Sequence, residues 1–318
     1  MWVYIAERVL RTLITLLFAV TLIFFAIRVL PGDPAEAMLG RHISVEGLET
    51  IRRQMGLDRS ILEQYVLFLS DLLRGDLGTS LAVGEPVSKL LLDVAPYTAV
   101  VVLGALLIGA VIGIPLGIAS AIHRNRATDY LARFLSLGGI SLPGFVIAIL
   151  LMLAFAVQVS WFPLVGGGDA RNLGSLLYYG LLPALAGGIG MAAYLTRLTR
   201  STYLEVLSED YIRTARAKGL PERRVLYKHA LRNALIPITT LLGLYAIIMI
   251  GDSITIEIVF SRPGFGRLIM GGITQRDYIV LQSVLLIYVA IAAVLNLIVD
   301  LLYAAIDPRI QIAHKGSG

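Results

Sequence analysis

The chain has 318 residues, of which 57% are hydrophobic and only 15% are charged. With a mean hydropathy of +0.79, this composition excludes an ordinary soluble domain and predicts a protein built mainly of membrane-spanning helices. The formal net charge of +5 comes from basic residues beside apolar runs, where membrane topology explains them better than nucleic-acid binding does. The sequence contains no cysteine, which excludes disulfides and thiolate metal sites.

The first apolar run, Thr12 to Ile27, follows the charged residues Glu7, Arg8 and Arg11 and is long enough with its flanks to span a bilayer. A cleaved signal peptide is the competing interpretation. The apolar core is longer than usual for one, and a Pro-Gly-Asp-Pro motif follows it rather than a small-residue cleavage site. We therefore expect residues 1–30 to hold a permanent first span with a cytoplasmic N-terminus.

Residues 31–94 form a polar insertion in which acidic residues outnumber basic ones, as expected on the outer side of a membrane. Ser44 can cap one helix, which Gly56 ends. The sequence Ser60-Ile-Leu-Glu63 is a capping box that opens a second helix, and Pro86 is expected to begin another short one. The insertion is thus predicted to be an external helical domain.

Residues 95–306 are predicted to form the membrane core. The expected spans are 95–122, 131–159, 176–196, 234–258 and 279–304. Leu142-Pro143-Gly144 interrupts the second of these runs and predicts a kink or a break there. Four glycines in the first run predict a close approach to another helix; they are Gly104, Gly109, Gly113 and Gly117.

These runs together predict an all-α polytopic membrane protein with about six transmembrane helices and both termini in the cytoplasm. Residues 307–318 are expected to be a cytoplasmic tail. Its last five residues, His314 to Gly318, are typical of an expression remnant and carry no weight in the fold prediction.

The longest charged segment of the second half runs from Glu205 to Pro237. Leu204, Leu207, Tyr211 and Ala215 fall at helical spacing on one face of its first part. The glycine that follows can take the left-handed conformation that ends a helix, and the proline two positions later suits the first turn of another. A location in a basic cytoplasmic loop would explain the positive charge of this segment. It would not explain the apolar stripe or the positions of the glycine and the proline.

This segment resembles the coupling loop of binding-protein-dependent ABC importer permeases, whose general pattern is Glu-Ala-Ala-x3-Gly-x9-Ile-x-Leu-Pro. We therefore name residues 200–233 the coupling loop. Aligned on Gly219, the Glu-Ala-Ala positions hold Arg213, Thr214 and Ala215, so this match is partial. The run Thr-Ala-Arg-Ala-Lys-Gly-Leu, followed by His-Ala-Leu-Arg-Asn-Ala-Leu-Ile-Pro, is similar to the dipeptide/oligopeptide branch of the family. That resemblance extends over nearly the whole chain.

The resemblance implies a type I ABC importer permease in the plasma (inner) membrane of a prokaryote. Its implied partners are a second homologous permease, two ABC ATPases that bind ATP and Mg²⁺, and an external substrate-binding protein. The branch takes up dipeptides and oligopeptides, and relatives carry nickel, glutathione or haem-like cargo. The residues that the resemblance assigns to ATPase coupling are Asp210, Tyr211, Arg213, Thr214, Ala215, Lys218, Gly219, Leu220 and Pro221.

Four polar residues lie on the last two predicted spans, namely Asp252, Glu257, Asn296 and Asp300. Charged groups inside a bilayer are costly and commonly face protein or water, so these residues could line or gate a pathway. The alternative is that they lie near span ends, solvated or bonded to a neighbouring helix. We give the two interpretations equal weight.

Two other function classes compete with the permease. The chain has no Gly-x4-Gly-Lys-Ser/Thr motif, so it does not bind ATP through a P-loop. An ion-coupled secondary transporter would need paired broken helices, and Pro143-Gly144 supplies only one break. An intramembrane hydrolase is poorly supported, since Gly139-Ile-Ser-Leu-Pro-Gly144 only approaches Gly-x-Ser-x-Gly. All four histidines also lie outside the predicted spans; they are His42, His123, His229 and His314.

Overall fold

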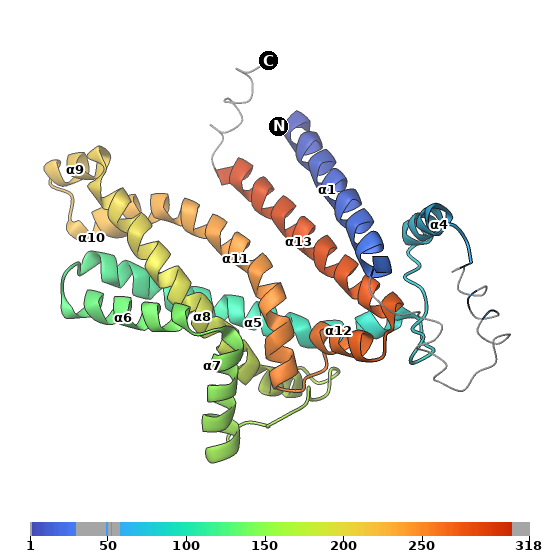
Figure 1. Cartoon of the computed structure of the whole chain (residues 1–318). Helices are drawn as coiled ribbons and strands as arrows, with labels where there is room; N and C mark the ends of the chain where they lie inside the picture. Colours follow the sequence, from blue (N-terminus) through green and yellow to red (C-terminus); the bar gives the residue numbers. More distant parts are fainter. Residues whose placement is uncertain (1, 30–48, 50–51, 53–57, 307–318) are drawn as a thin grey trace. The chain divides into compact units, whose positions relative to one another are not determined.

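The computed structural model describes residues 2–29, 49, 52 and 58–306, and these are almost entirely helical (Figure 1). The chain divides into two compact units. The first contains residues 1–9, 97–262 and 294–318, and the second contains residues 10–96 and 263–293. Apart from residues 49 and 52, the helix expected between Ser44 and Gly56 lies outside the described residues.

Five helices in the described part of the chain are long and apolar enough to cross a membrane, or six if one bent pair counts as a span. The five are α1 (Trp2–Val29), α5 (Val87–Ile122), α8 (Leu173–Ser208), α11 (Leu231–Val259) and α13 (Tyr278–Ile306). The bent pair is α6 (Ala127–Ser141) followed by α7 (Gly144–Leu151) and the π-helical segment η2 (Met152–Gln158). This agrees with the predicted all-α polytopic class.

The predicted interruption at Leu142-Pro143-Gly144 is confirmed, and it is a sharp break. The two halves meet at an angle of 101°. Proline disfavours the helical conformation of the residue before it, and Leu142 is extended, with φ −98° and ψ 126°. The helix stops at Ser141 and restarts at Gly144 because Pro143 cannot continue the hydrogen-bond ladder.

The close approach predicted from four glycines is also confirmed, and the neighbour is α8. A Cβ at Gly104 would lie 2.8 Å from the Cβ of Ala184, and one at Gly117 would lie 2.6 Å from the Cβ of Thr199. The equivalent positions at Gly109 and Gly113 are equally tight. Alanines and glycines on α8 complete the contact, as small residues do where membrane helices touch.

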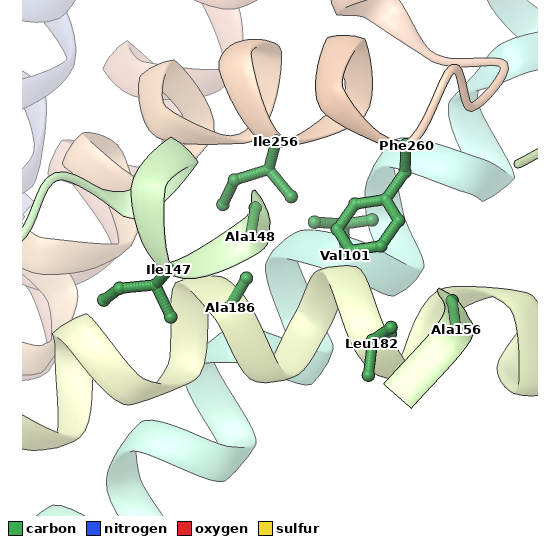
Figure 2. Close-up of a cluster of buried hydrophobic side chains, with 8 residues drawn as sticks. All are labelled: Val101, Ile147, Ala148, Ala156, Leu182, Ala186, Ile256 and Phe260. Carbon is green, nitrogen blue, oxygen red and sulfur yellow. The ribbon is translucent and has the colours of Figure 1, made fainter. Parts of the chain in front are cut away.

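A buried apolar cluster joins α5, α7, η2, α8 and α11 within the first unit (Figure 2). It contains Val101, Ile147, Ala148, Ala156, Leu182, Ala186, Ile256 and Phe260. Figure 2 shows Ile256 of α11 and Phe260, the residue after this helix, directed at Ala148 and Val101, with Leu182 and Ala186 of α8 on the other side. The cluster fixes the bent pair against α8 and α11.

The second unit contains α4 (Ile61–Leu73), and its predicted capping box is present. The Ser60 hydroxyl accepts a hydrogen bond from the Glu63 N–H, and the Glu63 carboxylate accepts one from the Ser60 N–H. These bonds hold the pKa of Glu63 below its usual value. The helix packs on α1 through Tyr65 and Phe68, whose rings lie 5.1 and 5.3 Å from that of Phe24.

Two features of the second unit differ from the prediction. Pro86 does not begin a separate short helix, because the helix that starts at Val87 continues without a break to Ile122. The segment between the predicted spans 234–258 and 279–304 contains a further helix, α12 (Phe265–Thr274), whose Phe265 and Ile269 are buried. The ten residues of α12 are too few to be recognised in the sequence as an apolar run separate from the next span.

Candidate coupling and pathway sites

The coupling loop is a compact helical structure within the first unit. It contains the end of α8, then α9 (Asp210–Ala217), α10 (Glu222–Arg224), the π-helical segment η3 (Val225–Ala230) and the start of α11. Figure 1 shows α9 and α10 together at the far end of α8. Glu209 is extended, with φ −67° and ψ 147°, and this single residue turns the chain from α8 into α9.

The buried face of α9 consists of Ile212 and Ala215. They belong to an apolar cluster that also contains Tyr203 and Val225. The predicted face through Tyr211 and Ala215 is therefore corrected: Ala215 is only 7% exposed and packs inside the chain's own core. An eight-residue helix is marginal alone, and burial of its one apolar stripe against α8 and η3 holds it in place.

Gly219 ends α9 as predicted. Its φ is +73°, in the left-handed region that favours glycine. The Leu220 N–H donates to the Ala215 carbonyl at 3.4 Å and the Gly219 N–H donates to the Arg216 carbonyl at 2.9 Å, which together form a Schellman motif. Leu220 then packs against the buried cluster.

Pro221 lies just before α10 rather than at its first helical position. Its ψ of 137° makes it the N-cap, and the Arg224 N–H donates to its carbonyl at 2.8 Å. The second helix is also not a short one. The segments α10, η3 and α11 follow each other directly from Glu222 to Val259, so the chain after Pro221 continues into the next span without a loop.

The opposite face of α9 is exposed and polar. It presents Asp210, Tyr211, Arg213, Thr214 and Lys218. Tyr211 is 41% exposed, and its hydroxyl accepts a hydrogen bond from Asn233 Nδ2 at 2.9 Å. Arg213 pairs with Asp210 at 3.3 Å on the same face.

An ion pair bridges the Gly219 corner from one side to the other. Arg216 Nη2 and Nε donate to the two carboxylate oxygens of Glu222 at 2.8 and 3.2 Å. The guanidinium lowers the pKa of Glu222, and the carboxylate raises the pKa of Arg216. Both side chains are largely solvated, so the pair orients the corner more than it stabilises it.

Tyr203 of α8, which was not predicted from the sequence, fixes the coupling loop to α8. Its ring is fully buried in the same cluster, and its hydroxyl donates to the Leu226 carbonyl at 2.8 Å. A carbonyl in a π-helical segment such as η3 is displaced from the regular ladder. The only feature of the sequence that could have indicated this role is the position of Tyr203 in the last turns of a span, just before a long loop.

Asp129, near the start of α6, is a buried carboxylate that was not predicted from the sequence either. Arg200 of α8 binds it in a bidentate manner at 2.7 and 2.9 Å. The Ser120 hydroxyl and the Asn125 N–H donate to it at 2.7 and 2.9 Å. This network joins the ends of α5, α6 and α8 next to the coupling loop.

The four predicted pathway residues do not form one cluster. Asp252 is exposed on α11, whereas Glu257, just over one turn later, is fully buried. Asn296 is exposed on α13, and Asp300 lies one turn after it. Asp300 pairs with Arg8 of α1 at 3.0 Å, and each side chain is about one third exposed. This pair matches the alternative in which Asp300 is bonded to a neighbouring helix.

A buried arginine lies just beyond the end of α11. Arg262 is fully buried, its Nη2 donates to the Leu176 carbonyl at 3.3 Å, and its guanidinium carbon lies 5.4 Å from the centre of the Tyr97 ring. Burial lowers the pKa of Arg262 below its usual value, while Glu257 opposes that shift. Arg262 thereby connects the starts of α5 and α8 to the end of α11.

No group of three or more potential metal ligands occurs among the described residues. Comparison with known proteins identifies a family for the chain. Residues 113–312 match the family described as "Binding-protein-dependent transport system inner membrane component", and residues 1–102 match its N-terminal family.

Among curated proteins, the chain is 39% identical over 308 residues to "Glutathione transport system permease protein GsiC" of Salmonella paratyphi A, covering 97% of this chain and 98% of that protein. It is 40% identical, with the same coverage, to the protein of the same name from Pectobacterium atrosepticum. In its fold it is similar to a chain of the methionine ABC transporter MetNI in an inward-facing conformation, with a TM-score of 0.57 and 19% identity, covering 69% of this chain and 97% of that one. The chain therefore belongs to the binding-protein-dependent transport system inner membrane components and is the permease of an ABC importer, neither an ion-coupled secondary transporter nor an enzyme.

Proposed function

We propose that this permease moves small peptides into the cytoplasm and that glutathione, a tripeptide, is the first cargo to test. Support for a peptide cargo comes from the near full-length similarity to permeases named for glutathione. Polar groups in otherwise apolar spans, such as Asp252 and Asn296, suit a cargo that carries amides and charges. We also propose that the permease lies in a prokaryotic plasma membrane with both termini in the cytoplasm.

The transporter in this proposal is a complex. The permease pairs with a second, homologous permease, two ATPase subunits bind ATP and Mg²⁺, and an external binding protein delivers the cargo. The ATPase contacts the exposed face of α9 through Asp210, Tyr211, Arg213, Thr214 and Lys218. The other proposed coupling residues act indirectly: Ala215 and Leu220 anchor α9, while Gly219 and Pro221 shape its corner.

The observation that carries this proposal is the way α9 is fixed to two spans. Ile212 and Ala215 are buried against α8 and η3, and the Schellman motif at Gly219 fixes the exit. The Asn233–Tyr211 hydrogen bond connects α9 to the first turn of α11. A force on the exposed face of α9 is therefore passed to α8 and α11 instead of being lost in a loose loop.

The test uses the complete transporter reconstituted in vesicles. Thr214→Arg places a long charged side chain on the exposed face without entering the buried cluster, since Thr214 is exposed and its hydroxyl donates only to the Asp210 carbonyl of its own helix. We expect this variant to reach the membrane and to lose both ATP-driven uptake and cargo-stimulated ATP hydrolysis. The matched control, Thr214→Ser, keeps that hydroxyl and should transport normally.

Full uptake by Thr214→Arg would contradict docking on α9. The cargo is tested separately with the same vesicles. Unlabelled glutathione should compete with uptake of labelled glutathione, and dipeptides should compete more weakly. No ATP-dependent glutathione uptake, with uptake of another cargo intact, would contradict only the cargo assignment.

A further inference from the structure

A groove of about 690 Å³ lies between α6 and α8, next to the Asp129–Arg200 network. We call it the α6–α8 groove. Its lining combines three arginines and four serine or threonine side chains with three apolar or aromatic ones, and the residues that matter here are Tyr130, Arg133, Phe134, Leu137, Arg197 and Arg200. Neither the proposed ATPase contact on α9 nor the predicted pathway residues account for it.

The groove carries an excess of positive charge. Arg200 is neutralised by its bidentate contact with Asp129. Arg133 lies over the ring of Tyr130 at 5.5 Å. In the described part of the chain, no carboxylate lies within ion-pair distance of Arg133 or Arg197. Two cationic groups are therefore available to an anion from outside the chain.

The wall beside these charges is apolar and open. Phe134 is 74% exposed and Leu137 is 62% exposed, and Leu131 and Leu135 continue the apolar surface around α6. Such a surface on a membrane helix suits acyl chains. A groove that holds two cations and continues into an apolar surface matches an amphiphile with an anionic end.

The depth of the arginines also fits a lipid headgroup. Arg133 is six residues from the start of α6, which corresponds to roughly 9 Å along the helix. Side chains on a helix lean towards its N-terminus, so the Arg133 guanidinium points back to the membrane surface beside Tyr130. The charge thus lies near the level of the phosphates of the leaflet at the α5–α6 turn.

We propose that the α6–α8 groove binds an anionic phospholipid of the cytoplasmic leaflet, with Arg133 and Arg197 on its phosphate and the apolar wall of α6 against its acyl chains. Basic pockets between membrane helices on the cytoplasmic side are known to hold such headgroups. The choice of leaflet rests on the cytoplasmic orientation in the proposed function. The groove adjoins the network that fixes α6 to α8 just before the coupling loop, so the lipid stabilises that junction.

The test measures lipid retained by the purified complete transporter. The complex is exchanged into detergent containing either dioleoyl-phosphatidylglycerol or dioleoyl-phosphatidylcholine, and bound lipid is counted by native mass spectrometry over a lipid titration. We expect saturable binding of phosphatidylglycerol only. Arg133→Gln/Arg197→Gln should weaken it by about thirtyfold, since each lost charge near the membrane surface costs roughly fivefold.

The matched control is Arg124→Gln/Arg126→Gln, which removes two exposed arginines from the neighbouring α5–α6 turn but none from the groove. It should change binding by less than threefold. Equal losses in both double variants, or equal retention of the two lipids, would overturn the proposal. If the groove variant fails to assemble, Arg133→Lys/Arg197→Lys keeps the charge and should retain the lipid, whereas its loss would refute charge recognition.

Two other occupants are outcomes of the same experiment. Displacement of bound phosphatidylglycerol by millimolar glutathione would assign the groove to cargo. Protection of a Ser201→Cys thiol by the second permease subunit, in the absence of lipid, would assign it to the subunit interface. Because lipid retention is read without transport, a transporter that fails to move glutathione can still bind the lipid, and the two proposals fail independently.

Discussion

A graded series at Gly219 tests whether the conformation of the corner, rather than a contact there, is needed for transport. The residue has φ of +73°, and a Cβ added to it meets no atom within 4 Å. Alanine would therefore cost only backbone strain, about 1–2 kcal/mol for the left-handed region. Valine is β-branched and belongs at the upper end of the range of about 1–3 kcal/mol. Asparagine tolerates this region best and should cost least.

These costs act on the equilibrium between the native corner and a displaced one. A difference of about 1–3 kcal/mol changes such an equilibrium by roughly 5- to 150-fold. Coupling should therefore decline in the order glycine, asparagine, alanine, valine. The assay is the number of cargo molecules taken up per ATP hydrolysed by the reconstituted transporter, with the amount of assembled complex measured in each sample.

Two results would refute the reasoning. Wild-type coupling in Gly219→Val would show that the left-handed corner is dispensable. An equal loss in all three variants would show that the missing side chain matters, by making room for a partner, and that the backbone conformation does not.

Three further predictions follow from other contacts. Arg200→Met leaves the buried Asp129 carboxylate without its cationic partner and should cost about 3–5 kcal/mol of stability. The loss is measured as a lower thermal midpoint of the purified permease. The double variant Asp129→Asn/Arg200→Met should recover part of that stability, and a double variant as unstable as the single one would contradict this account. A cysteine introduced at Glu49 or Asp71 should react with an impermeant thiol reagent from outside the cell. The native chain has no cysteine, so all labelling reports the introduced residue. Labelling seen only after the inner face of the membrane is made accessible would contradict the predicted topology. Asp300→Asn should lower uptake while the complex still assembles, because the pair with Arg8, in which each side chain is about one third exposed, contributes no more than about 1 kcal/mol to stability. Normal uptake by Asp300→Leu would show that Asp300 has no pathway role.

Features governed by local rules could be predicted from the sequence. The capping box at Ser60 and Glu63 depends on two side chains three residues apart. The stop at Gly219 and the break at Pro143 depend on the backbone preferences of single residues. Long apolar runs gave the spans, with errors of several residues at their ends because helices continue beyond the membrane, as α8 does up to Ser208.

Features that depend on contacts distant in sequence could not be predicted. Ala215 fits an apolar stripe equally well whether that stripe meets a partner or its own chain, and only the positions of Tyr203 and Val225 decide between them. Asp129 and Arg200 are separated by 71 residues, and no spacing rule relates them. Arg262 is surrounded by residues from three different helices, so its burial follows only from the packing of α5, α8 and α11.

The length of α8 has a mechanical consequence. Its 36 residues form one helix from Leu173 to Ser208, with Pro183 ten residues after its start. Pro183 lacks the N–H that would complete the helical ladder, so it is the position where this helix resists bending least. From Pro183 to Ser208 the helix is roughly 38 Å long, and a swing of about 1.5° there displaces Ser208 by about 1 Å. In the proposed coupling the helix works as a lever: a displacement at Ser208 arrives at the level of Pro183 as a small change of angle, in a region where glycines and alanines leave α5 and α8 almost no free space.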